Sequence, residues 1–201
     1  MKYLFPNNIV QSLVLGSCVS ASLVSTGWAH GSDDHKHDKK VTVVAGVTGA
    51  GDHKYKADPE WGRMSAGEAM GSTHGGVVLD KEGKVYVSTN GPSAIQVFDA
   101  SGKHIKKMAP EARGLHHMLI REEKGEEYIY GAQLMSKPHR IVKLNLKGEI
   151  VLTIPNEATG EVEGGFKGTT GVAVAADGTI YASMGYGSNL IHAFSPEGKL
   201  L

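Results

Sequence analysis

Residues 171–201 read GVAVAADGTIYASMGYGSNLIHAFSPEGKLL. Three short apolar runs are separated by an acidic turn with glycine and by a glycine-rich corner, and after a Pro-Glu-Gly turn a fourth run begins at Lys199. The same text occurs at residues 76–108, where Tyr86 takes the place of Tyr181. Short apolar runs bounded by such turns are typical of antiparallel strands, and a unit that repeats along a chain indicates stacked copies.

A third copy lies between these two, at residues 114–155. Its four predicted strands are Met118–Ile120, Tyr128–Tyr130, Ile141–Leu144 and Ile150–Ile154. Its first turn, REEKGEE, is read as two residues longer than the DKEGK turn of the first copy. The turn glycines Gly83, Gly125 and Gly178 are 42 and 53 residues apart.

Four short strands every ~40–50 residues is the period of a β-propeller blade. A β-sandwich also has many short strands, but it does not repeat the same strand and turn text three times. The sequence therefore predicts an all-β fold, a β-propeller with about three four-stranded blades over residues 73–201, preceded by a lead-in strand and loop at 41–72. Because propellers close with ~4–8 blades, we expect these blades to be part of a six-bladed ring in a longer chain. An oligomerising half-propeller is the alternative.

The first 29 residues resemble a secretory signal peptide, with Lys2 near the start and small residues before a cleavage site after Ala29. Leu15-Gly16-Ser17-Cys18 also resembles a lipobox, which would make Cys18 a lipidated N-terminus. We therefore expect a secreted or periplasmic protein, with a lipoprotein at the membrane surface as the alternative. Because Cys18 is the only cysteine, the mature domain has no disulfide.

Residues 30–40, HGSDDHKHDKK, are charged and unpatterned, and we expect a disordered His-rich linker there. The chain has 21 basic and 21 acidic residues, so nothing in its net charge favours a nucleic-acid partner. No apolar run after residue 29 reaches the ~20 residues of a transmembrane helix.

Histidines stand where predicted inner strands begin, at His74 in the first copy and at His116 and His117 in the second. Inner strands of a propeller surround a central channel, so these imidazoles could form a metal site of the kind that zinc prefers. The alternative is that each histidine caps a backbone group at a turn. His104, His139 and His192 fall on middle or outer strands, and we expect them at the surface.

The text GKVYVS at 83–88 and GTIYAS at 178–183, each followed by a strand that ends in Phe and a turn with Gly-Lys, is similar to NHL repeats. The resemblance covers residues 73–201 and implies an NHL-type propeller. That family includes binding scaffolds, sensors and enzymes, so the resemblance is specific for the fold alone.

One branch of that family resembles the chain more closely. The run from Gly185 through Tyr186 to Lys199 looks like a blade of the peptidyl-α-hydroxyglycine α-amidating lyase, a six-bladed propeller with a zinc held by three histidines and a nearby calcium. The resemblance implies a catalytic role for Tyr186 and a zinc-ligand role for His116. The chain departs from the pattern where Gly187 replaces a disulfide cysteine and Leu190 replaces an arginine.

Two functions are therefore expected. The first is a non-catalytic scaffold that binds a peptide, glycan or protein on the propeller face. The second is a metal-dependent lyase with His116, His74 and His117 as candidate ligands and Tyr186 in the chemistry. The acidic residues of REEKGEE are read as a solvated turn, with calcium as the alternative.

Overall fold

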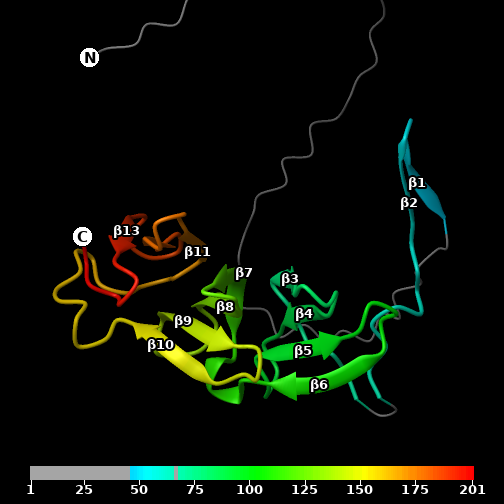
Figure 1. The fold of residues 1–201 in the computed structure, drawn as a ribbon, viewed down its shortest axis with the longest axis horizontal. Helices are drawn as coiled ribbons and strands as arrows, with labels where there is room; N and C mark the ends of the chain where they lie inside the picture. The colour runs from blue at the N-terminus through cyan, green and yellow to red at the C-terminus, as the bar shows by residue number, and fades with distance from the viewer. Residues whose placement is uncertain (1–45, 66–67) are drawn as a thin grey trace, which may run out of the picture. The chain divides into compact units, whose positions relative to one another are not determined.

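The computed structural model describes residues 46–65 and 68–201 (Figure 1). The predicted signal peptide with Cys18, the predicted linker at 30–40 and most of the predicted lead-in strand lie outside the described residues. The described chain begins with a hairpin of exposed strands, β1 (Val47–Ala50) and β2 (His53–Lys56). None of the described residues belongs to a helix of the length and hydrophobicity that crossing a bilayer requires.

Three consecutive antiparallel sheets follow, each with its strands paired in chain order. The first blade consists of β3 (Val77–Leu79), β4 (Val85–Ser88), β5 (Ile95–Phe98) and β6 (His104–Met108). The second consists of β7 (Leu115–Glu123), β8 (Glu126–Gln133), β9 (Arg140–Asn145) and β10 (Ile150–Ile154). The third consists of β11 (Gly171–Val174), β12 (Ile180–Ser183) and β13 (Ile191–Phe194).

This arrangement is a β-propeller, and it confirms the fold predicted from the repeated text. In the third blade the predicted fourth strand is reduced to one bridge, between Phe194 and Leu200. A single 3₁₀ turn, Pro110–Ala112, connects the first blade to the second. Turn glycines adopt the expected left-handed conformation, with φ of 80° at Gly83 and 89° at Gly178.

The core is divided between the blade junctions. One cluster of buried side chains joins the first blade to the second and includes Ile95, Leu115 and Ile129. Another joins the second blade to the third and includes Tyr130 and Phe194. The second blade therefore buries both of its faces against its neighbours, and the first and third blades each bury the face that meets it, as stacked repeats must.

A third, smaller cluster lies on the face of the first blade that is turned away from the second blade. There Met64 and Met70 cover the buried side chains of Val85, Val87 and Phe98. The described residues of segment 64–70 form a loop. Trp61 stacks at a tilt on Phe98, with ring centroids 5.5 Å apart.

The acidic text of the second blade is not a long turn, contrary to the prediction. β7 and β8 continue through it, pairing Glu122 with Glu127 and Glu123 with Glu126, and the turn is confined to Lys124 and Gly125. Both turn residues have positive φ, 52° and 87°, which suits the tight hairpin turns that match strand twist. The two additional residues therefore lengthen the hairpin.

This longer hairpin forms hydrogen bonds and an ion pair with both neighbouring blades. Toward the third blade, the Arg121 guanidinium donates hydrogen bonds of 3.0 Å to the carbonyls of Val174 and Ala176. Toward the first blade, Glu122 forms an ion pair with Lys81, and the Glu127 carboxylate accepts a bond from the Lys81 backbone N–H at 3.1 Å.

Candidate functional site

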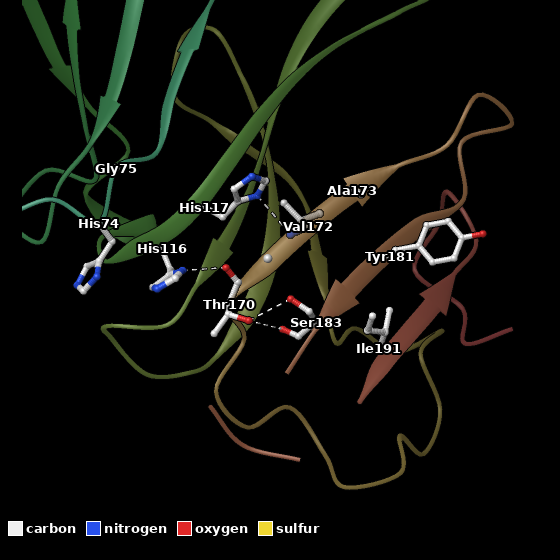
Figure 2. Close-up of a pocket in the computed structure, with 11 residues that line it drawn as sticks. His74, Gly75, His116, His117, Thr170, Val172, Ala173, Tyr181, Ser183 and Ile191 are labelled. Carbon is white, nitrogen blue, oxygen red and sulfur yellow. Dashed lines mark hydrogen bonds between the residues drawn. The ribbon is translucent and has the colours of Figure 1, made fainter. Parts of the chain in front are cut away.

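Two of the predicted histidines meet at the starts of the inner strands (Figure 2). His74 precedes β3 and His116 lies near the start of β7. Their rings are stacked, with centroids 5.0 Å apart and an interplanar angle of 28°. The repeat places these residues together because each opens an inner strand of adjacent blades.

Thr170, at the equivalent place before β11, fixes the His116 ring. The carbonyl oxygen of Thr170 is 2.8 Å from His116 Nδ1, so this nitrogen carries the proton and donates. In the neutral ring, Nε2 is then left with its lone pair as an acceptor. The Thr170 hydroxyl is hydrogen-bonded to the Ser183 hydroxyl at 3.0 Å and accepts from the Gly185 N–H at 3.1 Å.

His117 is turned away from this pair. Side chains of successive strand residues point to opposite faces, and a β-bulge also interrupts the register with β8 between Leu115 and His117. The Val172 N–H donates to His117 Nδ1 at 3.4 Å, and Figure 2 shows the ring directed toward β11. His117 therefore links the second and third blades.

Tyr186 joins the site from the corner between β12 and β13. Its ring meets the His116 ring edge-on, with centroids 5.5 Å apart at 89°. The side chain is 63% exposed. The structure thus brings His74, His116 and Tyr186 together, although 112 residues separate the first from the last.

Glycines hold the Tyr186 corner tightly against residues 167–168. The Tyr186 N–H donates to the Gly168 carbonyl at 3.3 Å, and a Cβ on Gly187 would lie 1.8 Å from the Lys167 carbonyl oxygen. A cysteine at this position, which the family resemblance would imply, cannot fit this backbone. The departure at Gly187 therefore has a steric reason.

A cleft of about 420 Å³ opens beside the histidine pair. Imidazoles and the Thr170 and Ser183 hydroxyls lie toward one end of it, and Tyr181 and Ile191 lie toward the other (Figure 2). The remaining lining residues are Gly75, His117, Gly171, Val172 and Ala173. Sequence reasoning missed Ser183, Tyr181 and Ile191 as site residues, because the repeat presents them only as ordinary strand positions.

Two histidines of the cleft, His74 and His117, have lowered pKa values. Partial burial lowers the pKa of His74 below its usual value, and the nearby His116 lowers it further. Burial also lowers the pKa of His117, and the nearby His116 lowers it further. Both shifts favour the neutral form of these two rings, in which one nitrogen donates and the other accepts.

The predicted metal ligands are only partly assembled. His74 and His116 are adjacent, but over residues 46–65 and 68–201 no group of three or more His, Cys, Asp or Glu side chains is placed to hold a metal ion. The acidic hairpin residues have protein partners: Glu123, for example, accepts a bond from the Tyr130 hydroxyl at 2.5 Å. The zinc and calcium assignments stay predictions.

The expectation of surface positions for three other histidines is corrected. His104 is half-buried, with its Nε2 3.0 Å from the Gln96 amide oxygen. His192 is buried, with 9% exposure, because it packs near Phe194, with ring centroids 6.3 Å apart. His139 is half-buried, and its Nδ1 accepts a hydrogen bond from the Gly168 N–H at 2.9 Å.

A scan of protein-family models and a search of curated proteins find no match to this chain. Solved structures with a distant likeness include a protein of unknown function from Bacteroides caccae (16% identity, TM-score 0.48) and virginiamycin B lyase from Staphylococcus aureus (18%, 0.46). A streptogramin B lyase is a further match (19%, 0.41). They cover 62%, 63% and 63% of this chain, which spans 46%, 39% and 39% of theirs, less than half of each.

Proposed function

We propose that this chain is an exported NHL-type propeller that acts as a binding module, and that its ligand site is the cleft beside His74 and His116. The observation that carries the proposal is the stacked histidine pair with the Tyr186 ring at its edge. Three ring systems from three blades converge on one point. Hydroxyl groups lie beside them, and the cleft extends along β11.

The chemistry of the cleft selects a class of ligand. The Nδ1–H of His116 is committed to the Thr170 carbonyl, so in the neutral ring Nε2 is the acceptor, and the site then favours a ligand that offers an N–H or O–H donor. Ring faces and the exposed Tyr181 and Ile191 side chains offer apolar contact. A segment of a peptide or a glycan has both properties, and protein partners could present such a segment.

The proposal is tested by retention of the full chain on immobilised peptide and glycan arrays. We expect His116→Ala to reduce retention at least tenfold, because it removes the acceptor and the stacking face, and Tyr186→Phe to leave most of it. His53→Ala is the matched control, since His53 is exposed on β2 and lies outside the cleft. Absence of retention on every probe, or equal retention by His116→Ala and His53→Ala, would contradict the proposal.

A second candidate, a metal-dependent lyase resembling the amidating lyase, has one observation in its favour. A metal-bound histidine usually donates its other N–H to a carbonyl or carboxylate, as His116 donates to Thr170. His74 and His116 could supply two imidazoles to zinc, which as a Lewis acid polarises a carbonyl. The described residues supply no third ligand, so no catalytic step follows from them.

Metal analysis separates the two candidates. The lyase candidate predicts stoichiometric zinc in the purified full chain and its loss in His116→Ala. Zinc retained equally by both proteins, or absent from both after incubation with excess zinc, would eliminate the lyase candidate and leave the binding module in place.

A further inference from the structure

The second blade holds a lysine ammonium beside a carboxylate and two tyrosine rings. Glu123 accepts a hydrogen bond of 2.5 Å from the Tyr130 hydroxyl and forms an ion pair of 2.6 Å with Lys143. The Lys143 ammonium lies 4.2 Å from the centroid of the Tyr128 ring and 5.3 Å from that of the Tyr130 ring, within the range of cation–π contacts. The second blade therefore supplies the cation for its own partly buried carboxylate.

The first blade repeats the tyrosine and the carboxylate but not the lysine. Strand registers match Tyr86 with Tyr130. On the next strand, Tyr86 is paired with Val97, whereas Tyr130 is paired with Lys143. The Tyr86 hydroxyl donates to Asp80 Oδ2 at 2.9 Å, as the tyrosine of the second blade donates to its own carboxylate. Val97 therefore stands where the second blade has its ammonium.

Asp80 has no cation of its own. It is 7% exposed, and its Oδ1 accepts a bond from the Lys84 backbone N–H at 2.8 Å. Over the part of the chain that the structure describes, no Lys, Arg or His nitrogen lies within ion-pair distance of this carboxylate, and the Lys84 ammonium pairs with Glu82. Burial raises the pKa of the Tyr86 hydroxyl, and the bond to Asp80 and the charges of Asp80, Glu127 and Glu82 raise it further. Because buried charges are stable when they are paired, this carboxylate favours a cation that the described residues do not provide.

A cavity of about 420 Å³ opens at Asp80, with walls from the first and second blades. Asp80 follows β3, whereas His74 precedes it, so the cavity lies at the other end of the strand from the histidine cleft. The two hollows share no lining residue. The volume of this cavity lies in the range of small-molecule sites.

The walls of the cavity carry one excess negative charge and have an apolar side. Three carboxylates line it against two ammonium groups, those of Lys84 and Lys106. The Lys106 ammonium donates to the Leu146 carbonyl at 2.9 Å, a neutral oxygen. Val97, Ile105 and Leu146 provide the apolar side. These walls match a ligand that carries one positive charge on a short alkyl chain.

We propose that this cavity binds an alkyl primary ammonium ion. Its charged group pairs with Asp80 and takes the place in the first blade that Lys143 takes in the second. Its alkyl part lies against Val97 and Ile105. A free amine and the side chain of a lysine in a peptide share this chemistry. This site is separate from the ligand cleft of the proposed function, so either can fail without the other.

Titration of the full chain with n-butylammonium chloride, followed by methyl NMR, tests this inference. We expect saturable shifts of the Val97 and Leu146 methyl signals. n-Butyrate, which has a similar shape and the opposite charge, should give none at the same ionic strength. N-acetyl-lysine amide distinguishes the two sources: binding as tight as that of butylammonium assigns the site to lysine side chains, and exclusion assigns it to free amines. Absence of a saturable shift with butylammonium, or equal shifts with butyrate, would overturn the proposal.

Three variants locate the binding. Asp80→Asn should bind butylammonium at least about tenfold more weakly, because it removes the charge-assisted bond. Asp99→Asn is the matched control and should bind normally, since Asp99 accepts the Lys103 N–H at 3.0 Å in the β5–β6 turn and lies outside the cavity. Val97→Lys should abolish binding, because the chain then supplies the ammonium itself. Equal affinity of Asp80→Asn and Asp99→Asn would overturn the proposal even if Val97→Lys does not fold.

Discussion

Replacing Gly187 with alanine should loosen the corner that presents Tyr186. The added Cβ would lie 1.8 Å from the Lys167 carbonyl oxygen, whereas ordinary van der Waals contact begins at 3.4 Å, so the backbones must separate by about 1.6 Å. The other atoms that the Cβ would meet within 3 Å also belong to Lys167, so no flexible side-chain end can absorb the overlap. Separation also strains the 3.3 Å bond from the Tyr186 N–H to Gly168.

Overpacking of this kind costs about 1–3 kcal/mol. With an m value of about 2 kcal/mol/M, a cost of about 2 kcal/mol lowers the urea midpoint by about 1 M. Gly91→Ala is the control, because its Cβ would meet only the Thr89 hydroxyl at 3.4 Å in the corresponding corner of the first blade. Nuclear Overhauser contacts between Tyr186 and His116 should weaken in Gly187→Ala alone. Equal midpoints for the two variants and unchanged contacts would refute the reasoning.

Two further predictions concern the core. Burial and then a hydrogen bond to a carboxylate, Asp80 or Glu123, raise the pKa of the Tyr86 and Tyr130 hydroxyls. The contribution of these hydroxyls to the free energy of unfolding is present below the ordinary tyrosine pKa of about 10 and is lost as pH rises above it. The urea midpoint should therefore fall less between pH 8 and pH 11 in Tyr130→Phe than in the natural chain. An equal fall in the two proteins would contradict this. Leu115→Ala should lower the free energy of unfolding, measured with urea, by about 2–5 kcal/mol, because Leu115 is fully buried. A loss below about 0.5 kcal/mol would show that neighbouring side chains have moved to fill the cavity.

Much of the fold could be predicted because its information is local and repeated. Glycine turns, apolar strands and a period of about 40–50 residues identify the blades before any contact is known. The lengthened β7–β8 hairpin was predicted wrongly, since four glutamates in seven residues read as a solvated turn. In the structure, partners from other strands and blades, such as Lys81 and Lys143, hold these carboxylates, and no local pattern reveals them.

The candidate site could be predicted in part for the same reason. The repeat shows that His74 and His116 open adjacent inner strands, and the structure places them together. It cannot show that His117 accepts a bond from the Val172 N–H, because this contact depends on how the third blade packs against β7. It also cannot show that the Thr170 carbonyl accepts a bond from the His116 ring, since every residue has a backbone carbonyl and the residue type does not reveal its partner.

The β7–β8 hairpin also bears on how the chain unfolds. In an array of repeats, stability is a sum of repeat terms and nearest-neighbour terms, and end repeats open first when the neighbour terms are weak. Arg121 and Glu127 add polar neighbour terms on both sides of the middle blade, beyond the two apolar clusters. Opening of the first or the third blade must then break bonds made by the second, which favours one cooperative transition over separate opening of single blades.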